Sequence, residues 1–323
     1  MSGLFDASEP LWLWIVFAVI VATALFVDFV LLRKQGSHVV NAKEAAIWSV
    51  IWVMVSLLFN ALLWWAVRDT TGDARIANEK AIHFLTGYLI EKSLAVDNIF
   101  IFLMIFGYFA VPPEYQKRVL MYGVVGAIIM RTIMILAGGW MLQQFHWLLY
   151  IFGVFLLLTG VKMWFSAGKE QSLDDNPALK LLRRVMTVSK NYDGERFFTI
   201  ENGHRVATPL LMVVALIEFS DVIFAVDSIP AIYAVTSDAF IVLTSNIFAI
   251  LGLRAMYFLL AAVANRFSLL SYGLACILVF IGIKMLLIDI FHIPAVVSLG
   301  VVMGILTITM ILSWQKTRNQ PVA

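Results

Sequence analysis

The chain has few charged side chains and almost no cysteine. Only 14% of its 323 residues are Asp, Glu, Lys or Arg, whereas 62% are hydrophobic. Soluble domains carry about 25% charged residues, so this composition excludes an ordinary soluble protein and predicts an integral membrane protein. The single cysteine, Cys276, excludes a disulfide framework or a thiolate metal cage within one chain. The net charge of +2 is too small to indicate nucleic-acid binding.

Short motifs that carry hydrolytic chemistry are also missing. The sequence has no His-Glu-x-x-His element of a metalloprotease and no Gly-x-Ser-x-Gly nucleophile elbow. The lone cysteine has no neighbouring histidine that could activate it. An intramembrane enzyme is therefore a poor match, and we expect the protein not to be an enzyme.

Long apolar runs are the dominant feature that is present. Each is roughly 20 residues or more, enough to cross the hydrocarbon layer of a bilayer as a helix. No Lys or Arg precedes the first run, which is also longer than the core of a signal peptide, so we expect a permanent first span. The nine predicted spans cover 11–32, 44–67, 82–110, 119–138, 147–166, 207–232, 239–262, 270–289 and 294–314.

Basic residues in the predicted loops give the orientation. Fifteen of them fall on one side of the membrane and three on the other, Arg68, Arg75 and Lys80. Lys and Arg accumulate in cytoplasmic loops, so the N-terminus is predicted to be periplasmic and the C-terminus cytoplasmic. We expect a multi-pass protein of a bacterial inner membrane, in contact with the lipid bilayer. Nothing in the sequence indicates its oligomeric state.

Two similar blocks of sequence predict an internal repeat. The spacing from Phe to Tyr to Gly-x-Lys-Met is the same in both, and chance similarity of apolar helices would not align Asp, Arg and Lys as well. Three helices per block is an odd number, so the second block must enter the membrane from the opposite side, as in many secondary transporters. The matched residues are Asp97, Arg131, Phe145, Tyr150, Gly160, Lys162 and Met163 in one block and Asp227, Arg254, Phe267, Tyr272, Gly282, Lys284 and Met285 in the other.

The predicted fold is an all-α polytopic membrane protein with about nine transmembrane helices and two inverted three-helix repeats. The predicted linker loop includes a polar, strand-like piece near Phe197–Val206; the loop is either a solvated connector or a basic patch on the membrane surface. The predicted divisions are two N-terminal helices in 1–81, the first repeat in 82–166, a cytoplasmic linker loop in 167–206, the second repeat in 207–289, and a last helix with a cytoplasmic tail in 290–323.

Two acidic segments lie inside these apolar runs. Each contains Ala-Val-Asp with another acid six residues earlier, Glu91 before Asp97 and Asp221 before Asp227. A charged side chain at the bilayer centre costs about 2.5–3.5 kcal/mol on insertion scales, so such a group predicts a cation path or a proton relay. The candidate metal ligands are Glu91, Asp97, Asn98, Glu218, Asp221 and Asp227; secondary candidates are Ser93, Ser220, Ser228, Lys92, Arg131, Arg254 and Asp28.

These secondary candidates have different expected roles. The three hydroxyls would add oxygen ligands, and Lys92, Arg131 and Arg254 would neutralise part of the acidic cluster. Asp28 would line a cytoplasmic entrance.

The spacing of the acids restricts how they can meet. Six residues turn an ideal helix by about 240°, so Glu91 and Asp97 cannot share one face of a straight helix. Glu218 and Asp221 can, because they are three residues apart. Two alternatives remain open: the helices break near Ala-Val-Asp, which Pro230 favours in the sixth span, or the acids serve separate points along one path.

The candidate ligands also restrict the ion. Carboxylate, amide and hydroxyl oxygens suit Mn²⁺, Mg²⁺ or Ca²⁺. The histidines His83, His146 and His292 fall near span ends, so a zinc site has little support. We expect no tightly bound cofactor, and a divalent ion, with H⁺ as a candidate coupled ion, as the transported substrate.

At these residues the chain resembles a known family. The segments Gly87–Asn98 and Glu218–Ile232 resemble the two signature motifs of the TerC family, and the run Thr244–Tyr257 is equally characteristic. The resemblance covers nearly the whole chain. It implies an inner-membrane protein of a branch associated with manganese export and alkaline pH, with metal carried by the acids of the two motifs; the family name comes from tellurium resistance.

Two functions therefore follow from the sequence. The first is a Mn²⁺ exporter, with Ca²⁺ as an alternative ion and proton exchange through the same carboxylates, because metal binding requires them deprotonated. The second is a membrane scaffold or assembly factor behind tellurite or envelope stress resistance. In the second case the cytoplasmic loop would matter more than the buried acids.

Overall fold

The helical character of the chain is confirmed. The computed structural model describes residues 10–35, 41–145, 147–166, 188–189, 191–201, 203–261, 269–287, 289–291 and 293–318. Every predicted span coincides with helix in these residues. The helices are α1 Leu11–Gln35, α2 Ala42–Thr71, α3 Ala74–Tyr108, α4 Pro113–Gln144, α5 Leu148–Ser166, α7 Pro209–Tyr233, α8 Ala239–Leu251, α9 Leu253–Ala261, α10 Leu270–Leu286 and α11 Ala295–Arg318.

Several of these helices are membrane spans by length and composition. Among the described residues, α1, α2, α4 and α7 are each long and apolar enough to cross a membrane. α8 and α9 form a bent pair that together makes a fifth candidate span. α5, α10 and α11 contain shorter apolar segments. α3 has 35 residues, long enough to cross a membrane, and it carries the first acidic segment. The predicted all-α polytopic membrane fold is therefore confirmed.

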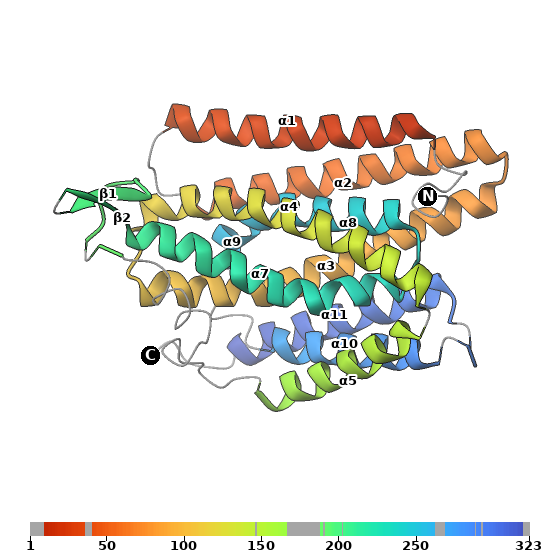
Figure 1. The fold of residues 1–323 in the computed structure, drawn as a ribbon. Coiled ribbons are helices and arrows are strands. Elements are labelled where there is room, and N and C mark those ends of the chain that lie inside the picture. Colours follow the sequence, from red (N-terminus) through yellow and green to blue (C-terminus); the bar gives the residue numbers. More distant parts are fainter. Residues whose placement is uncertain are drawn as a thin grey trace.

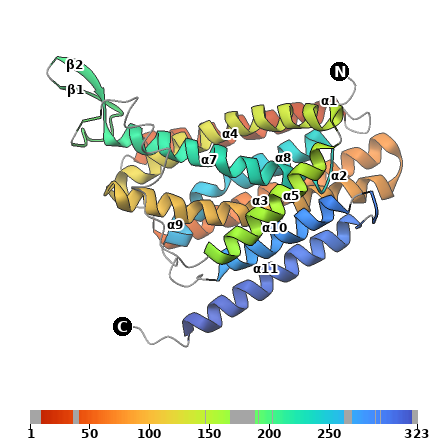
Figure 2. The same cartoon turned by 60° about the horizontal axis from the view of Figure 1, so that its bottom comes forward.

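The helices lie side by side in one elongated bundle (Figure 1). α3 is at its centre and packs against α8, α2, α7 and α11. Turning the molecule shows α11 on its outside, beside α10 (Figure 2). Large apolar side chains such as Phe26 of α1 and Ile308 of α11 are at least 60% exposed, as lipid-facing positions of a membrane bundle should be. Charged side chains such as Glu91 and Arg131 are buried inside the bundle instead.

α5 and α10 approach each other more closely than ordinary side chains allow. A Cβ added at Gly160 would lie 2.9 Å from the carbonyl oxygen of Ala275, and one added at Gly282 would lie 2.8 Å from that of Gly153. In the predicted repeat Gly160 corresponds to Gly282 and Gly153 to Ala275, so the two contacts exchange when the blocks are exchanged. This reciprocity is what a two-fold axis between α5 and α10 requires, and it supports the predicted inverted repeat.

Of the two alternatives for the acidic segments, a helix break near Ala-Val-Asp is wrong. α3 runs without interruption from Ala74 to Tyr108, and α7 continues through Pro230 to Tyr233. Pro230 lies in the last turn of α7 and removes the helical hydrogen bond that its own nitrogen would donate, while Tyr233 anchors this turn by donating to the Ile135 carbonyl at 2.8 Å. The other alternative remains, in which the acids serve separate points of one path.

The break occurs instead between α8 and α9, where the axis bends by 42°. Gly252 separates the two helices, and a Cβ there would lie 2.4 Å from the Lys92 ammonium. That ammonium donates to the Ala249 carbonyl at 3.1 Å. The end of α8 therefore has a cationic side chain against one of its last carbonyls, which helix ends otherwise leave without an intrahelical partner.

A small hairpin projects from one end of the bundle (Figure 1). Its strands are β1 Phe198–Glu201 and β2 His204–Ala207, paired antiparallel, which confirms the strand-like piece expected near Phe197–Val206. Tyr192 donates to the Phe109 carbonyl at 2.7 Å, and Arg118 pairs with Glu195 at 2.8 Å. These contacts hold the segment on the turn between α3 and α4. The rest of the predicted linker, 167–187, lies outside the described residues.

Candidate ion-transport site

A buried arginine joins the two acidic segments. The side chain of Arg131, on α4, is 1% exposed. Its Nε donates to Asp221 at 3.0 Å and its Nη2 donates to the second oxygen of the same carboxylate at 2.8 Å. Its Nη1 donates to Glu91. One cation from α4 thus binds an acid of α3 and an acid of α7.

Two neutral side chains complete this arrangement, which we call the Arg131 network: Arg131, Glu91, Asp221, Ser228 and Asn246. The amide nitrogen of Asn246 donates to the second oxygen of Glu91 at 3.0 Å. Nη1 of Arg131 also reaches the Ser228 hydroxyl at 3.3 Å and the Asn246 carbonyl oxygen at 3.4 Å. Buried charges are tolerated inside a protein when they pair with opposite charges and are fully hydrogen-bonded, as they are here.

Both acids in the Arg131 network occupy the same position in their segments. Glu91 lies six residues before Asp97, and Asp221 lies six residues before Asp227. The earlier acid of each segment is therefore the one that Arg131 binds. Asp97 and Asp227 lie within α3 and α7, but their side chains are outside the described part of the structure.

Glu218 is separate from the Arg131 network. Its carboxylate lies directly on the backbone of α4, since a Cβ at Gly126 would meet all three carboxyl atoms at 2.3 Å. Its Oε1 is buried and has no hydrogen-bond partner among the described residues. As predicted, Glu218 and Asp221 share the face of α7 that looks toward α4, but only Asp221 has a buried cation as partner.

The remaining predicted oxygen ligands have other surroundings. The Ser93 hydroxyl donates to the Leu89 carbonyl at 2.6 Å, and the Ser220 hydroxyl donates to the Leu216 carbonyl at 2.8 Å. Both bonds stay within one helical turn, a common arrangement for serine inside helices. Asn98 is 3% exposed. Of the three predicted hydroxyls, only Ser228 contacts the Arg131 network.

Two of the three predicted neutralising cations are elsewhere. Arg254 pairs with Asp28 of α1 at 2.5 Å, so among the described side chains Arg254 balances an acid outside the two acidic segments. Lys92 donates to the Ala249 carbonyl. Arg254 is the second residue of α9, beyond the bend. The expected entrance residue Asp28 is 5% exposed and engaged in this pair.

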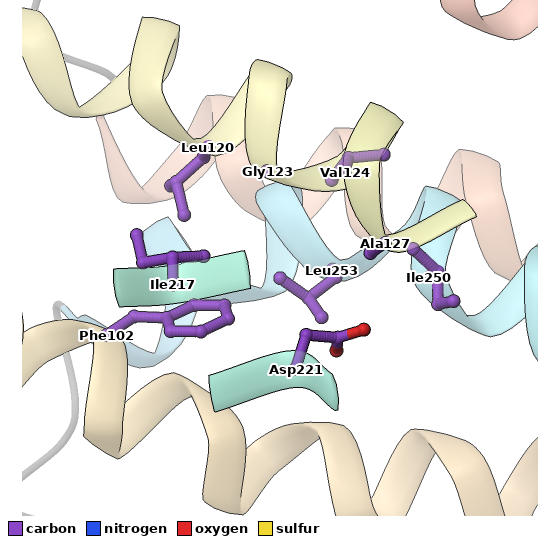
Figure 3. A pocket seen from close by; sticks show the side chains of 9 residues that line it. All are labelled: Phe102, Leu120, Gly123, Val124, Ala127, Ile217, Asp221, Ile250 and Leu253. Atoms are coloured by element: carbon purple, nitrogen blue, oxygen red, sulfur yellow. The ribbon is translucent and has the colours of Figure 1, made fainter. Parts of the chain in front are cut away.

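A narrow pocket adjoins the Arg131 network (Figure 3). It runs along α4 from Leu120 to Ala127, and Gly123 widens it by contributing no side chain. Asp221 is the one charged side chain among the residues that line it; the others are Phe102, Val124, Ile217, Ile250 and Leu253. The pocket therefore brings a single carboxylate to an otherwise apolar space between α3, α4, α7, α8 and α9.

Comparison with known proteins decides the family. The family model described as "Integral membrane protein TerC family" matches residues 76–321, which includes all the acids of both segments. The chain belongs to the TerC family. No solved structure matches it.

Relatives of this TerC family member extend over nearly its whole length. A candidate membrane-bound redox modulator named Alx from Escherichia coli (strain K12) is 59% identical over 308 residues, which is 95% of this chain and 96% of that protein. The protein of the same name from Salmonella typhi is 59% identical, covering 93% of each chain. An uncharacterised membrane protein of Myxococcus xanthus is 48% identical, covering 96% of this chain and 94% of its own.

The described side chains of this TerC family member do not form a ready-made metal cage. In that part of the chain, no three His, Cys, Asp or Glu side chains converge as metal ligands. Glu91 and Asp221 are both occupied by Arg131. An ion that used these carboxylates would have to compete with the guanidinium.

Sequence reasoning missed Asn246. It lies in the Thr244–Tyr257 run that carried the family resemblance, and it is 0% exposed. A polar run of Thr, Ser and Asn inside an otherwise apolar predicted span was the available signal. Its partner was not predictable, because the contact between α8 and α3 joins residues 155 positions apart.

Proposed function

We propose that this TerC family member is a secondary transporter that exports Mn²⁺ from the cytoplasm across the bacterial inner membrane. The Arg131 network is the observation that carries this proposal, because it gathers an acid from each signature segment at one buried point of the bundle. Buried charges inside a membrane bundle are expensive, and they mark ion pathways by default. Carboxylate and amide oxygens match the ligand preference of Mn²⁺.

The proposed path follows the pocket beside Asp221. In the predicted orientation the hairpin end of the bundle is cytoplasmic, and the pocket extends from Asp221 toward the residues of α4 nearest that end. Mn²⁺ would enter along α4, meet Asp221 and Glu91, and leave on the opposite side. Asp97, Asn98 and Asp227 are the proposed further ligands, and proton exchange through the carboxylates is the proposed coupling.

The test uses purified protein in liposomes that contain a divalent-sensitive dye. Mn²⁺, Ca²⁺ and Mg²⁺ uptake is compared for the native chain, Glu91→Gln and Asp221→Asn, with and without a pH gradient. Asp289→Asn is the control, because Asp289 is exposed at a helix end and bonds Tyr150. We expect Mn²⁺ flux that both buried substitutions abolish and the control retains. Absence of flux from the folded native protein would refute the proposal.

The relatives named as redox modulators bear on this proposal only indirectly. The chain has a single cysteine, Cys276, so it cannot form a disulfide within itself. A redox effect of this protein would therefore not rest on a disulfide within one chain.

The scaffold function remains the second candidate because of the hairpin. Ile200 and Phe198 are 75% and 44% exposed, a surface that a partner protein could cover. Phe198→Ser with Ile200→Ser would abolish function under this alternative, while Glu91→Gln would not. The opposite pattern supports transport.

A further inference from the structure

The guanidinium of Arg131 occupies the position between the two motif acids. All four oxygens of Glu91 and Asp221 have donors: three receive Arg131 nitrogens and the fourth receives Asn246. Neither carboxylate has an oxygen that is free of a donor. A divalent ion that binds both carboxylates therefore competes with the guanidinium, whose positive charge lies between them.

Arg131 also keeps its positive charge at every pH that the protein meets. A guanidinium does not lose its proton in proteins, unlike a lysine ammonium. Glu91 and Asp221 are 0% and 3% exposed, so an unpaired charge on either carboxylate would be poorly solvated. Arg131, another cation or a proton must therefore neutralise these two carboxylates at every stage.

We propose that Arg131 is a tethered counter-cation, which faces Glu91 and Asp221 when no metal is bound and leaves them when the metal arrives. This inference rests on the proposed transport function. A carrier with two bare buried carboxylates would be too unfavourable to reorient. Arg131 supplies the positive charge for the metal-free return step, and Mn²⁺ supplies it for the loaded step.

The surroundings of Arg131 provide places for the displaced group. The Ser228 hydroxyl and the Asn246 carbonyl oxygen lie 3.3 and 3.4 Å from Nη1, longer than the 2.8 and 3.0 Å contacts with Asp221. These neutral acceptors can keep part of the guanidinium bonded after the carboxylates have turned to a metal ion. The switch therefore needs a local movement of one side chain.

A second buried arginine, Arg254, provides a comparison with Arg131 within the same chain. Arg254 occupies the corresponding position in the second predicted repeat, but it pairs with Asp28, 2.5 Å away, and it is not among the hydrogen-bond partners of Glu91 or Asp221 in the described part of the chain. A buried arginine that serves only to hold helices together should behave alike at both positions. A counter-cation should act at Arg131 alone.

The experiment compares two fluxes and one affinity. Purified native protein, Arg131→Gln and the double variant Asp28→Asn with Arg254→Gln are placed in liposomes. Net Mn²⁺ uptake into metal-free vesicles is measured beside exchange of labelled Mn²⁺ into Mn²⁺-loaded vesicles. Free Mn²⁺ is titrated against each protein in detergent by electron paramagnetic resonance.

Arg131→Gln should separate these readouts. Its apparent Kd for Mn²⁺ should fall about tenfold or more, because a competing state that reduces the binding-competent fraction has been removed. Exchange, which needs only the loaded carrier, should stay within about threefold of native, while net uptake falls at least about tenfold. The Asp28 and Arg254 double variant should keep the native ratio of the two fluxes and the native Kd.

Other outcomes overturn the inference. These are weaker Mn²⁺ binding by Arg131→Gln, a native ratio of net uptake to exchange in that variant, or the same change in the double control. If Arg131→Gln does not fold, Arg131→Lys decides: one ammonium cannot repeat the two-point contact with Asp221, so Kd should fall while net uptake continues, and unchanged or weaker binding refutes the idea. Native protein that neither binds nor carries Mn²⁺ refutes the proposed function itself.

Discussion

Enlarging either close-contact glycine of the α5–α10 pair should destabilise the protein. A Cβ at Gly282 would lie 2.8 Å from two backbone atoms, the Gly153 oxygen and the Leu157 nitrogen. Backbone atoms inside a helix cannot rotate away as a side chain can, so Gly282→Ala must push the helices apart. Van der Waals packing contributes to helix association in membranes, and small residues favour it because they let the backbones approach closely.

The magnitude follows from the geometry. Overpacking a tight interior contact costs about 1–3 kcal/mol, and we expect that range for Gly282→Ala. Gly160→Ala should fall in the same range, since its Cβ would lie 2.8 Å from Val279 Cγ2 and 2.9 Å from the Ala275 oxygen. The double variant should cost less than the two single costs together, because separating the helices once relieves both clashes.

The assay is reversible unfolding of the purified protein in mixed micelles, followed by circular dichroism. Gly300→Ala and Gly304→Ala on α11 are matched controls, because a Cβ at either position meets nothing within 4 Å. Single α5 and α10 variants as stable as these controls would refute the close-packing argument. A strictly additive double variant would refute the shared-interface argument.

Three further predictions concern the Glu218 contact and the hairpin. Gly126→Ala should reduce transport by more than it reduces stability. The new Cβ would lie 2.3 Å from the Glu218 carboxyl atoms, so it must displace this flexible side chain while the helix stays intact. Native flux in a folded Gly126→Ala protein would contradict this. Tyr192→Phe should expose the hairpin to limited proteolysis by removing a bond worth about 0.5–1.5 kcal/mol, and native protection would show that the Phe109 contact does not matter. Burial raises the pKa of Tyr192 to about 12, so this hydroxyl stabilises the docked hairpin fully below pH 10 and progressively less as the pH rises toward 12; protease protection that declines already between pH 7 and pH 9 would argue against it.

Much of this fold was predictable because membrane helices follow simple rules. Apolar length gave the helical ranges, and the strand-like polarity near Phe197–Val206 gave the hairpin. The acids and Arg131 stood out because charges in such runs are rare. The location of the helix break was not predictable in the same way. Pro230 is the stronger local signal, yet α7 continues through it and the bend lies at Gly252.

The pairing of charges was the least predictable part. Arg131 and Arg254 hold corresponding positions in the two blocks, so sequence alone treats them alike. Their partners differ because α1, which lies outside both blocks, brings Asp28 to Arg254. Asn246 was overlooked for a related reason, since its partner comes from a distant helix. Each of these pairings depends on three-dimensional neighbours that spacing along the chain does not specify.

The helices of one sequence block pack mainly against helices of the other. α3 packs most extensively against α8, α4 against α7, and α5 against α10. A repeat block that is continuous in sequence is therefore not a separate rigid body, because its helices are packed against those of the other block. Severing the chain within 167–187 would divide these three interfaces between two fragments. Co-production should restore an assembled protein, whereas the C-terminal fragment alone would leave Asp221 without Arg131, and the N-terminal fragment alone would leave Glu91 and Arg131 without Asp221 and Asn246.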